Sequence, residues 1–367
     1  MNITTPRKDL LAAATRAASV ADRKSTMPIL GTVLLTPTDN GLRVSASDLY
    51  LSLVEDIDAE ASGSAIAVDA HDLAARLKMM PDGPVDLARK DGNLTLKAKG
   101  SARRYTMRLI DGADFPPIPT PADDAPRITL PAKILTRLIA VTKHSISTDE
   151  TRAHMNSLKL ELESGLARAV STDGHRLTKL ELKVDGGAAA DLLIPLKAVV
   201  ELGKIAEGEE GDLTLIPRGS TLFTQSERST FSVKLVDAAF PPYAQVIPTA
   251  TQHTIGVPRV ALLDAIKAVA IAASEKTGGV RLAFDAGVVR ITSESPDGGD
   301  GADEVPCEVR AGSGKAIVGV NGKYLTDALG VLATDEVLLG ISGEIDPITI
   351  RTSDADGYVA VVMPMRI

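Results

Sequence analysis

Hydrophobic residues recur with a helical period in three segments of the chain that lie about 125 residues apart. The segments start near residues 7, 133 and 260 and are rich in Leu and Ala. In each segment, apolar residues stand at i, i+3 and i+4, which places them on one face of a helix. The spacing predicts three amphipathic helices, and their regular separation predicts that the chain repeats one structural unit three times.

A second helical segment follows in each repeat, over residues 69–80, 195–206 and 321–333. Leu73, Val199 and Leu325 occupy corresponding positions and are 126 residues apart. Asp and Asn can cap the free amides at a helix start, and Pro suits the first turn. The three predicted helices begin with such residues, at Asp69, Pro195 and Asn321.

The segments between the predicted helices alternate between apolar and polar residues. Stretches with this period of two include residues 41–46, 94–97, 158–162, 230–235 and 288–292. Strand-like runs bounded by Gly, Asp and Asn are typical of antiparallel meanders. We therefore predict an α+β fold in which each repeat packs two helices on one face of a larger set of antiparallel strands.

Two proline-rich segments end the first two repeats. Residues 109–117 (LIDGADFPP) resemble residues 235–242 (LVDAAFPP), and both precede further prolines. Proline does not pair as part of a central strand, so these segments are interpreted as linkers. They predict three domains, over residues 1–123, 124–250 and 251–367.

Composition narrows the class of protein. The chain of 367 residues is 44% hydrophobic but only 3% aromatic, so Leu, Ile, Val and Ala must build its cores. The single cysteine, Cys307, cannot form an internal disulfide and is interpreted as a half-buried strand residue. No Cys/His cluster has the spacing of a zinc site. The N-terminus lacks an apolar signal core, and no apolar run reaches the ~18 residues that span a bilayer, so we expect a cytoplasmic protein.

The net charge of −8 argues by itself against a nucleic-acid partner, but the charge is unevenly distributed. The six helical windows hold 16 basic and 9 acidic residues, a net charge of +7, which leaves −15 for the rest of the chain. If the helices share one surface, that surface attracts phosphates without reading bases. Ordinary solvated helix faces would give the same counts, so charge alone leaves both interpretations open.

Catalytic motifs are missing from the sequence. Residues 312–316 (GSGKA) lack the first glycine and the Ser/Thr of a phosphate-binding loop, and a hairpin turn is the better interpretation. Asp173 and His175 stand close together, but no Gly-x-Ser-x-Gly elbow supplies a nucleophile. We therefore expect no catalysis, no cofactor and no metal. An enzyme with a novel site at Asp173 and His175 remains an alternative.

Two segments are not explained by core packing. One is the polar turn within residues 171–177 (STDGHRL), and the other is the apolar C-terminal end, residues 361–367 (VVMPMRI). Pro364 should end the last strand. Termini are usually polar, whereas Met is common in peptide-binding grooves. The end of the chain is thus either a last strand in its own core or part of a binding groove.

These two segments and three others carry a resemblance to a known family. The chain resembles the bacterial sliding clamp, the beta subunit of DNA polymerase III, at residues 27–31 (MPILG), 171–177, 234–241, 274–282 and 358–366. The match over residues 274–282 is partial, because Ser274 stands where the family has an asparagine. The five segments occur in the same order as in the family and span all three repeats.

The resemblance implies a head-to-tail homodimer that closes into a ring of six similar domains, with helices lining the hole. Such a ring encircles duplex DNA, slides on it and tethers the replicative polymerase. In this family an ATP-hydrolysing clamp loader opens the ring, and repair proteins also bind it through a short linear motif. The main alternative is a three-repeat protein-interaction scaffold that does not encircle DNA.

The resemblance also assigns a motif-binding pocket between the second and third domains, next to the C-terminus. Apolar side chains would hold the anchors of the motif, while two arginines would frame the rim or meet acidic groups. Carried over by position, the pocket would use Met155, Thr172, Gly174, His175, Arg176, Leu177, Pro241, Val246, Ile345, Pro347, Val361, Met363, Pro364, Met365 and Arg366.

Contacts with DNA follow from the resemblance at basic positions. Asp149, Ala153 and His154 depart from the family pattern, so the resemblance leaves open whether the loop over residues 148–154 contacts DNA. The candidate DNA-binding residues are Arg23, Lys24, Lys78, Arg152 and Lys197.

The subunit interface implied by the resemblance joins an edge strand of the first domain to one of the third. Opposite charges across this seam would favour head-to-tail pairing. The first domain would contribute Arg103, Arg104 and Tyr105, and the third would contribute Ile271, Asp303 and Glu304.

Overall fold

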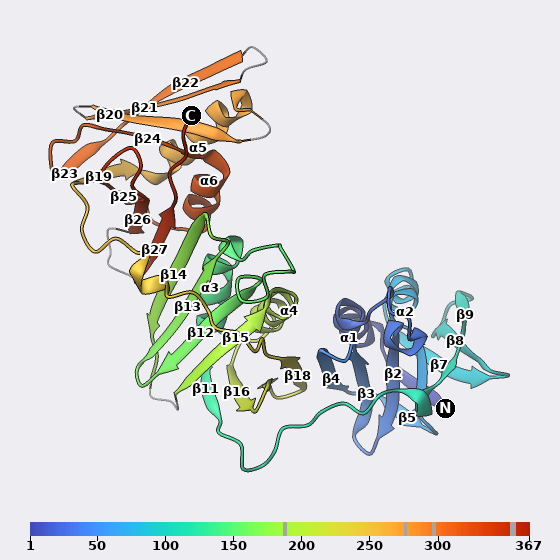
Figure 1. The fold of residues 1–367 in the computed structure, drawn as a ribbon. Coiled ribbons are helices and arrows are strands. Elements are labelled where there is room, and N and C mark those ends of the chain that lie inside the picture. Colours follow the sequence, from blue (N-terminus) through green and yellow to red (C-terminus); the bar gives the residue numbers. More distant parts are fainter. Residues whose placement is uncertain (186–188, 275–276, 286, 296–298, 353–356) are drawn as a thin grey trace. The chain divides into compact units, whose positions relative to one another are not determined.

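The structure is a computed structural model that describes residues 1–185, 189–274, 277–285, 287–295, 299–352 and 357–367 (Figure 1). It divides into two compact units, Met1–Ala132 with Val200–Leu235 and Lys133–Val199 with Val236–Ile367. Two residues of the partial match over 274–282, Glu275 and Lys276, lie outside the described residues.

Six α-helices occur in the described residues, two in each repeat: α1 (Arg7–Val20), α2 (Ala70–Lys78), α3 (Ala132–Thr142), α4 (Leu196–Glu207), α5 (Arg259–Val269) and α6 (Gly322–Gly330). The predicted helical segments are therefore confirmed. Asp69 caps α2 by accepting the Asp72 N–H at 2.7 Å, and Asn321 caps α6 by accepting the Lys323 N–H at 2.9 Å. Within the described part of the chain, no helix combines the length and apolar character that a membrane crossing requires.

The unit formed by Met1–Ala132 and Val200–Leu235 contains two antiparallel sheets. Helix α1 contacts α2 and lies on β3 (Gly41–Ser47) and β4 (Leu51–Ile57) (Figure 1). One sheet has the order β5-β1-β7-β8-β9, with bounds Glu60–Ser62, Asn2–Pro6, Pro84–Lys90, Asn93–Ala98 and Arg104–Arg108. The other has the order β10-β6-β2-β3-β4-β18-β17-β16-β11, with bounds Ile110–Asp111, Ile66–Asp69, Thr32–Thr38, Gly41–Ser47, Leu51–Ile57, Ser229–Lys234, Thr221–Gln225, Asp212–Arg218 and Ile128–Pro131.

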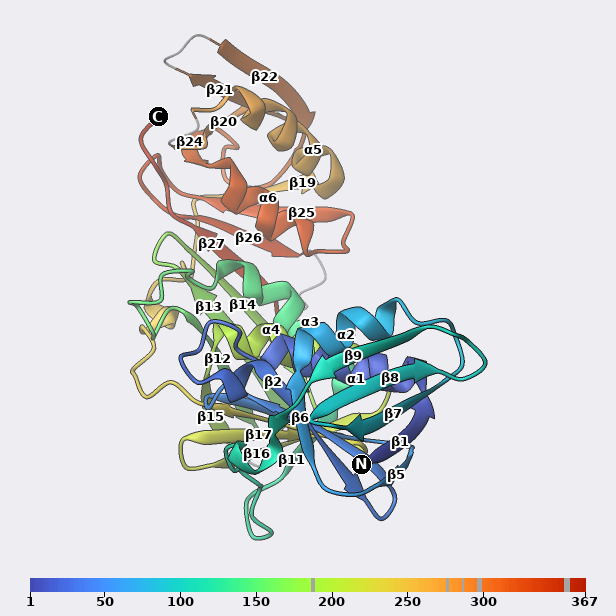
Figure 2. The same cartoon turned by 90° about the vertical axis from the view of Figure 1, so that its right-hand side faces the viewer.

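The unit formed by Lys133–Val199 and Val236–Ile367 also contains a nine-stranded sheet, together with a four-stranded one. Helix α5 contacts α6 and packs on β21 (Val288–Ser295) and β22 (Gly299–Pro306) (Figure 2). The larger sheet has the order β15-β12-β13-β14-β27-β26-β25-β19-β23, with bounds Ala190–Pro195, Ser157–Glu163, Leu166–Thr172, Arg176–Lys183, Val359–Val362, Ile348–Thr352, Glu336–Ile341, His253–Pro258 and Glu308–Ala311. The smaller has the order β22-β21-β20-β24, with bounds Gly299–Pro306, Val288–Ser295, Gly279–Asp285 and Ala316–Asn321.

Each nine-stranded sheet joins two repeats. In one, β4 of the first repeat pairs with β18 of the second, and in the other, β14 of the second pairs with β27 of the third. A repeat therefore does not close its sheets by itself, and the compact units cut through the second repeat. The cores are aliphatic, as composition predicted: apart from Phe223 and Phe231, the largest fully buried side chains are Ile and Leu.

Two local predictions are wrong. Residues 312–315 connect β23 to β24, which belong to different sheets, so they do not form a hairpin turn. Gly312 has a φ of +82° and Gly314 a φ of +72°, which lets the chain turn from one sheet to the other. Cys307 is half-buried as expected, but it lies between β22 and β23 rather than in a strand. Burial raises the pKa of its thiol.

Candidate partner-binding site

The polar turn over residues 172–176 is held by its own hydrogen bonds. Asp173 Oδ1 accepts the backbone N–H of His175 at 2.9 Å and that of Arg176 at 3.0 Å. Thr172 Oγ1 donates to the Arg176 carbonyl oxygen at 2.7 Å. Gly174 has a φ of +90°, a conformation that glycine adopts without strain. The turn therefore fixes the His175 and Arg176 side chains relative to β13 and β14.

Arg176 uses its guanidinium within the chain. Its Nε donates to Asp173 Oδ2 at 2.9 Å, and its Nη1 donates to Asp327 Oδ2 on α6 at 2.7 Å. The guanidinium carbon lies 4.5 Å from the centroid of the Tyr324 ring, within cation–π range. The Arg176 side chain is only 11% exposed. Arg176 thus joins the second repeat to α6 of the third, and its place on a pocket rim stays a prediction.

Leu177 and Val361 belong to one apolar cluster. They are direct partners in the β14–β27 register and are 2% and 1% exposed. The cluster also contains Val170 and Val359, and packed against it are Phe240, Tyr243 and Ile247. The segment that carries the predicted pocket residues Pro241 and Val246 therefore covers the strands that carry Leu177 and Val361.

Tyr243 anchors this covering segment. Its hydroxyl donates to Glu161 Oε2 on β12 at 2.7 Å. Burial, assisted by this hydrogen bond, raises the pKa of Tyr243 to about 12. Val246, which follows in the same segment, keeps its apolar side chain 42% exposed. An anchored backbone that presents an exposed apolar side chain is suited to line a groove.

The C-terminal tail is tied to the 172–176 turn and to β24. The Met363 N–H donates to the His175 carbonyl oxygen at 2.9 Å, and the Met365 N–H donates to the Gly319 carbonyl oxygen at 2.8 Å. A Cβ at position 319 would lie 2.6 Å from the Met365 carbonyl oxygen, so the tail's approach requires glycine there. Strand β27 ends at Val362, before Pro364, as predicted. The tail is therefore part of the ordered surface.

A groove of about 450 Å³ lies beside this tail in the third repeat. Three of the predicted pocket residues, Ile345, Met365 and Arg366, line it together with residues of β24. Ile345 is 76% exposed. Met155 and Pro347 are half-buried in segments before β12 and β26 and do not line this groove. The predicted pocket residues thus fall mainly into two groups, one around β14 and β27 and one along the tail.

Two residues on α6 that contact the turn, Tyr324 and Asp327, were not predicted from the sequence. The Tyr324 ring stacks on His175, with centroids 6.5 Å apart, and Asp327 pairs with Arg176. Aligning the repeats would have drawn attention to Asp327, because Glu201 stands 126 residues earlier, at the corresponding position of α4. Nothing in the sequence indicated that Asp327 meets the 172–176 turn.

His144, which lies beside Arg176, was not predicted from the sequence either. Burial and, to a lesser degree, the Arg176 charge lower its pKa to about 4, so its imidazole is neutral at physiological pH. Its Nε2 lies 3.2 Å from Thr178 Oγ1, and its buried Nδ1 has no hydrogen-bond partner among the described residues. A neutral imidazole beside Arg176 avoids placing two positive charges together.

The candidate DNA-binding cations lie in both compact units. In the first unit, Lys24 and Lys78 are exposed and have no ion pair among the described residues. In the second, Lys197 is exposed. Arg23 and Arg152 each pair with an aspartate, at 3.6 and 3.3 Å. The lysines are therefore better placed than the arginines to meet phosphates.

Part of the positive charge counted on the helices is offset by carboxylates from outside the helical windows. Arg16 Nε donates to Glu55 Oε2 on β4 at 2.8 Å, and Arg7 pairs with Asp82. The net charge of +7 therefore overstates the charge that these helices offer to phosphates.

The candidate interface residues lie at or beside sheet edges. Arg104 and Tyr105 belong to β9, and Asp303 and Glu304 belong to β22; each strand is the last of its sheet. The Arg76 guanidinium lies 5.3 Å from the centroid of the Tyr105 ring. Beyond the end of α5, Ile271 is 87% exposed.

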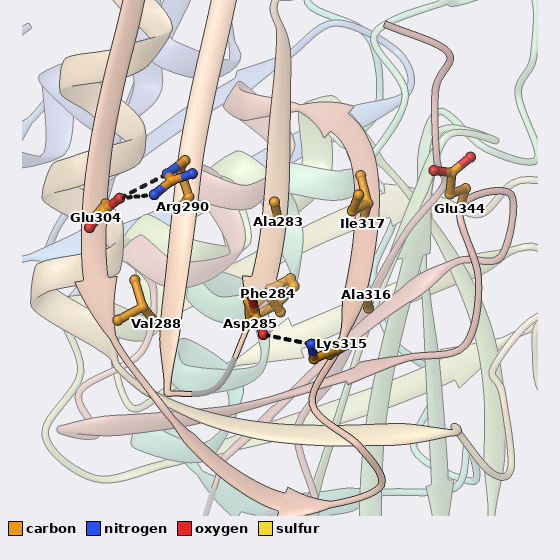
Figure 3. Close-up of a pocket in the computed structure, with 10 residues that line it drawn as sticks. All are labelled: Ala283, Phe284, Asp285, Val288, Arg290, Glu304, Lys315, Ala316, Ile317 and Glu344. Atoms are coloured by element: carbon orange, nitrogen blue, oxygen red, sulfur yellow. Dashed lines mark hydrogen bonds and ion pairs between the residues drawn. The ribbon is translucent and has the colours of Figure 1, made fainter.

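A larger hollow of about 690 Å³ lies on the four-stranded sheet (Figure 3). Its charges are mostly paired: Arg290 donates to Glu304 at 2.8 and 2.6 Å, and Lys315 lies 3.4 Å from Asp285. Figure 3 places Glu344 on a separate loop, beyond the strand that carries Ile317. Among the residues described, no group of His, Cys, Asp and Glu gathers where it could hold a metal ion.

Comparison with known proteins gives one family over the whole chain. The models of the DNA polymerase III beta subunit match its N-terminal domain to residues 1–119, its central domain to 129–242 and its C-terminal domain to 244–366. The beta sliding clamps of Pseudomonas putida and Pseudomonas aeruginosa are 30% and 29% identical to the chain, with all of each sequence covered.

Solved structures of beta subunits superpose on the whole chain. The Thermotoga maritima DNA polymerase III beta subunit superposes with a TM-score of 0.94 at 25% identity, covering 100% of this chain and 99% of that one. A DnaN sliding clamp from Pseudomonas aeruginosa bound to griselimycin gives 0.92 at 29% identity, with both chains fully covered. The sequence, the repeated fold and these relatives together place the chain in the DNA polymerase III beta subunit family, the beta sliding clamps.

Proposed function

We propose that two copies of this chain close head to tail into a ring that encircles duplex DNA and tethers the replicative polymerase to it. Sliding clamps are processivity factors rather than enzymes, in agreement with the expectation from the sequence. Asp173 accepts hydrogen bonds from backbone N–H groups and from Arg176, which gives its carboxylate a structural role in the turn.

The observation that carries the proposal is the way the repeats are joined. Strands β4, β14 and β22 occupy corresponding places in the three repeats, as do β9, β18 and β27. Within the chain, β4 pairs with β18 and β14 pairs with β27. The equivalent third pair is β22 of one copy with β9 of another, a heterologous contact that closes after two copies. The domains over residues 1–123, 124–250 and 251–367 are part of this proposal.

Side chains at these two edges support the pairing. Arg103 and Arg104 stand at the β9 edge, and Asp303 and Glu304 stand on β22, so opposite charges would meet, with Glu304 shared between Arg290 of its own chain and the β9 edge. The exposed Ile271 would lose its contact with water in such an interface. The two edges are therefore complementary in charge, and an apolar anchor lies near one of them.

DNA would be held by charge and not by sequence. The exposed Lys24, Lys78 and Lys197 can meet phosphates, whereas base readout needs side chains shaped to base edges. A few phosphate contacts keep a ring centred and still let it slide. Arg23 and Arg152 would contribute after leaving their aspartate partners.

The partner site would lie where the 172–176 turn, the 240–247 segment and the C-terminal tail meet the third repeat. Its exposed apolar side chains, Val246, Ile345 and Met363, suit a short motif with hydrophobic anchors. The polymerase, the clamp loader and other motif-bearing proteins would bind there in turn. Tethering raises the effective concentration of the polymerase at the primer end. A cytoplasmic location follows from this role.

Loading onto circular DNA tests the proposal. The protein is loaded by a matching clamp loader onto nicked circular duplex DNA, and half of the sample is then cut once with a restriction enzyme. A ring stays on the circle during gel filtration and slides off the linear ends. Equal retention on both forms would contradict encirclement and favour the interaction scaffold, while retention on neither at moderate salt would contradict loading itself.

A further inference from the structure

Asp327 stands where α6 meets the 172–176 turn. Its Oδ2 accepts a hydrogen bond from Arg176 Nη1 at 2.7 Å, and Lys323 Nζ lies 3.1 Å from the same oxygen. Burial disfavours the charged carboxylate, but the hydrogen bonds from Arg176 and Lys323 outweigh burial and lower the pKa of Asp327. Asp327 is therefore ionised at neutral pH and holds two cations.

Arg176 has little freedom once this pair has formed. A guanidinium is planar and presents its N–H groups in a fixed fork. One branch holds Asp173 and another holds Asp327, while the guanidinium lies over the Tyr324 ring. The two side chains of the Arg176–Asp327 pair are 11% and 23% exposed, so solvent screens it less than a surface pair. Without Asp327, Arg176 would keep the ring contact with Tyr324, but its one remaining carboxylate partner would be Asp173, within its own turn.

The turn that contains Arg176 also supports the tail. The carbonyl oxygen of His175 accepts the Met363 N–H, and the His175 ring stacks on Tyr324. The bonds of Asp173 lie within the turn and do not connect it to α6. The bond from Arg176 to Asp327 does make this connection, and it is the charged contact among those that join the turn to the third repeat.

The first junction between repeats contains a counterpart at the corresponding helix position. Glu201 on α4 is 8% exposed and accepts a hydrogen bond from Ser19 Oγ of the first repeat, and Lys204 Nζ lies 2.8 Å from Glu201 Oε1. At both junctions, an acidic side chain on the second helix of one repeat thus accepts a hydrogen bond from the preceding repeat. Glu201 meets a helix hydroxyl and no turn of a binding site, which makes it a matched control for Asp327.

We propose that Asp327 is a positioning residue of the partner site: it holds the Arg176 guanidinium, and with it the 172–176 turn, in the geometry that receives the partner's motif. Asp327 acts through Arg176 and does not itself contact the partner. This inference rests on the proposed function, because it concerns the same site. It predicts that motif affinity depends on an ion pair inside the clamp.

A peptide titration tests the inference. The probe is a fluorescein-labelled peptide that carries the clamp-binding motif of the replicative polymerase, titrated with the full-length protein and followed by fluorescence anisotropy. Asp327→Asn is nearly isosteric and should weaken binding about tenfold, because Arg176 loses the charged acceptor that orients it. Asp327→Glu restores the charge and should bind within about threefold of the unsubstituted chain. Glu201→Gln should lower the Tm about as much as Asp327→Asn does, but it should leave the peptide affinity unchanged.

A double-variant cycle separates positioning from general stability. If Asp327 acts through Arg176, adding Asp327→Asn to Arg176→Met costs no further affinity, because the two residues work as a unit. The double variant removes both charges of the pair, so it remains decisive even where Asp327→Asn alone does not fold. Unchanged affinity in Asp327→Asn, an equal loss in Glu201→Gln or a further loss in the double variant would each overturn the inference. Failure of the unsubstituted chain to bind the peptide would overturn the proposed site and the inference with it.

Discussion

The two junctions between repeats use corresponding strands, but their surroundings differ. At the first junction, β4 meets β18, and buried apolar pairs such as Leu51–Val233 are accompanied by polar contacts. The hydroxyls of Ser52 and Ser232 bond to each other across the strands, and Lys234 Nζ lies 5.9 Å from the centroid of the Tyr50 ring. We therefore interpret the first junction as a structural connection between repeats.

The second junction, between β14 and β27, carries additional elements. The 240–247 segment packs on its apolar cluster, and the C-terminal tail is bonded to His175 and Gly319. These elements leave apolar side chains exposed, among them Val246 and Met363. The second junction is a joint to which a binding surface has been added.

The difference follows from where the flanking segments go. Phe115, at the end of the first repeat, packs on Ile29 and Leu30 within its own repeat. Phe240, at the end of the second, packs on the cluster that contains Leu177 and Val361. The strand pairing is common to both junctions, and the partner site depends on segments outside it.

The largest effect is expected at the third junction, the one proposed to form between copies. Exchanging Asp303 and Glu304 for Lys places like charges opposite Arg103 and Arg104, and the dimer Kd should rise at least about 100-fold. Analytical ultracentrifugation measures the dimer, and adding Arg103→Glu and Arg104→Glu should restore it. An unchanged dimer Kd would contradict the proposal that β22 and β9 pair between copies in the way that the two internal junctions pair.

Truncating the paired core residues separates the structural and binding roles of the two junctions. Leu51, paired with Val233, and Leu177, paired with Val361, are each 2% exposed. Leu51→Ala and Leu177→Ala should each lower the free energy of unfolding by about 3–4 kcal/mol, because both leave a cavity. Urea unfolding measures this loss, and a peptide titration should find weaker binding only for Leu177→Ala. Equal binding by both variants would remove the proposed distinction.

A half-buried titratable residue, His144, should make the second junction sensitive to acid. His144 has a pKa of about 4 in the folded chain against an ordinary value of 6.5, so the unfolded state binds more protons between these values. The free energy of unfolding should therefore fall as pH drops from 6.5 to 4, by about 3 kcal/mol at most. Urea unfolding at pH 7 and pH 4.5 should find a smaller fall in His144→Gln. A pH dependence that survives the substitution would assign it to another group.

The smallest effect concerns the hydroxyl pair of the first junction. Ser52→Ala leaves the buried Ser232 hydroxyl without its partner and should cost about 1 kcal/mol, whereas Ser52→Ala with Ser232→Ala should cost less. At the second junction the corresponding pair is Thr178 and Ala360, and Thr178 bonds instead to Ser145 at 2.7 Å. Denaturant unfolding checks both variants, and additive losses would show that the two hydroxyls do not act as a pair.

Much of the fold was predictable because it depends on local patterns. Leu73, Val199 and Leu325 marked three equivalent helices, and the structure has a helix at each. The capping roles of Asp69 and Asn321 depend on their nearest neighbours and were predicted as well. The hairpin expected at residues 312–315 was predicted wrongly. Whether a turn makes a hairpin depends on which sheet the next strand joins.

The candidate site was predictable only in part. The resemblance named Leu177 and Val361, which the structure places opposite each other across β14 and β27. It did not name Tyr324, Asp327 or His144, and no short-range pattern distinguishes them from ordinary helix residues. The charge count also overlooked the pairing of Arg16 with Glu55, 39 residues away.

By itself, the sequence determined the threefold repeat, the two helices in each repeat, the aliphatic cores and the family. Periodicity sets the repeats and their helices, since it decides which face of a helix or strand is apolar. Composition sets the aliphatic cores, and the resemblance of five segments indicates the family. The tertiary structure alone decided that β14 pairs with β27 and that Arg176 reaches Asp327, 151 residues further along the chain. Which sheet edges meet, and which charges neutralise each other there, depends on how distant segments dock.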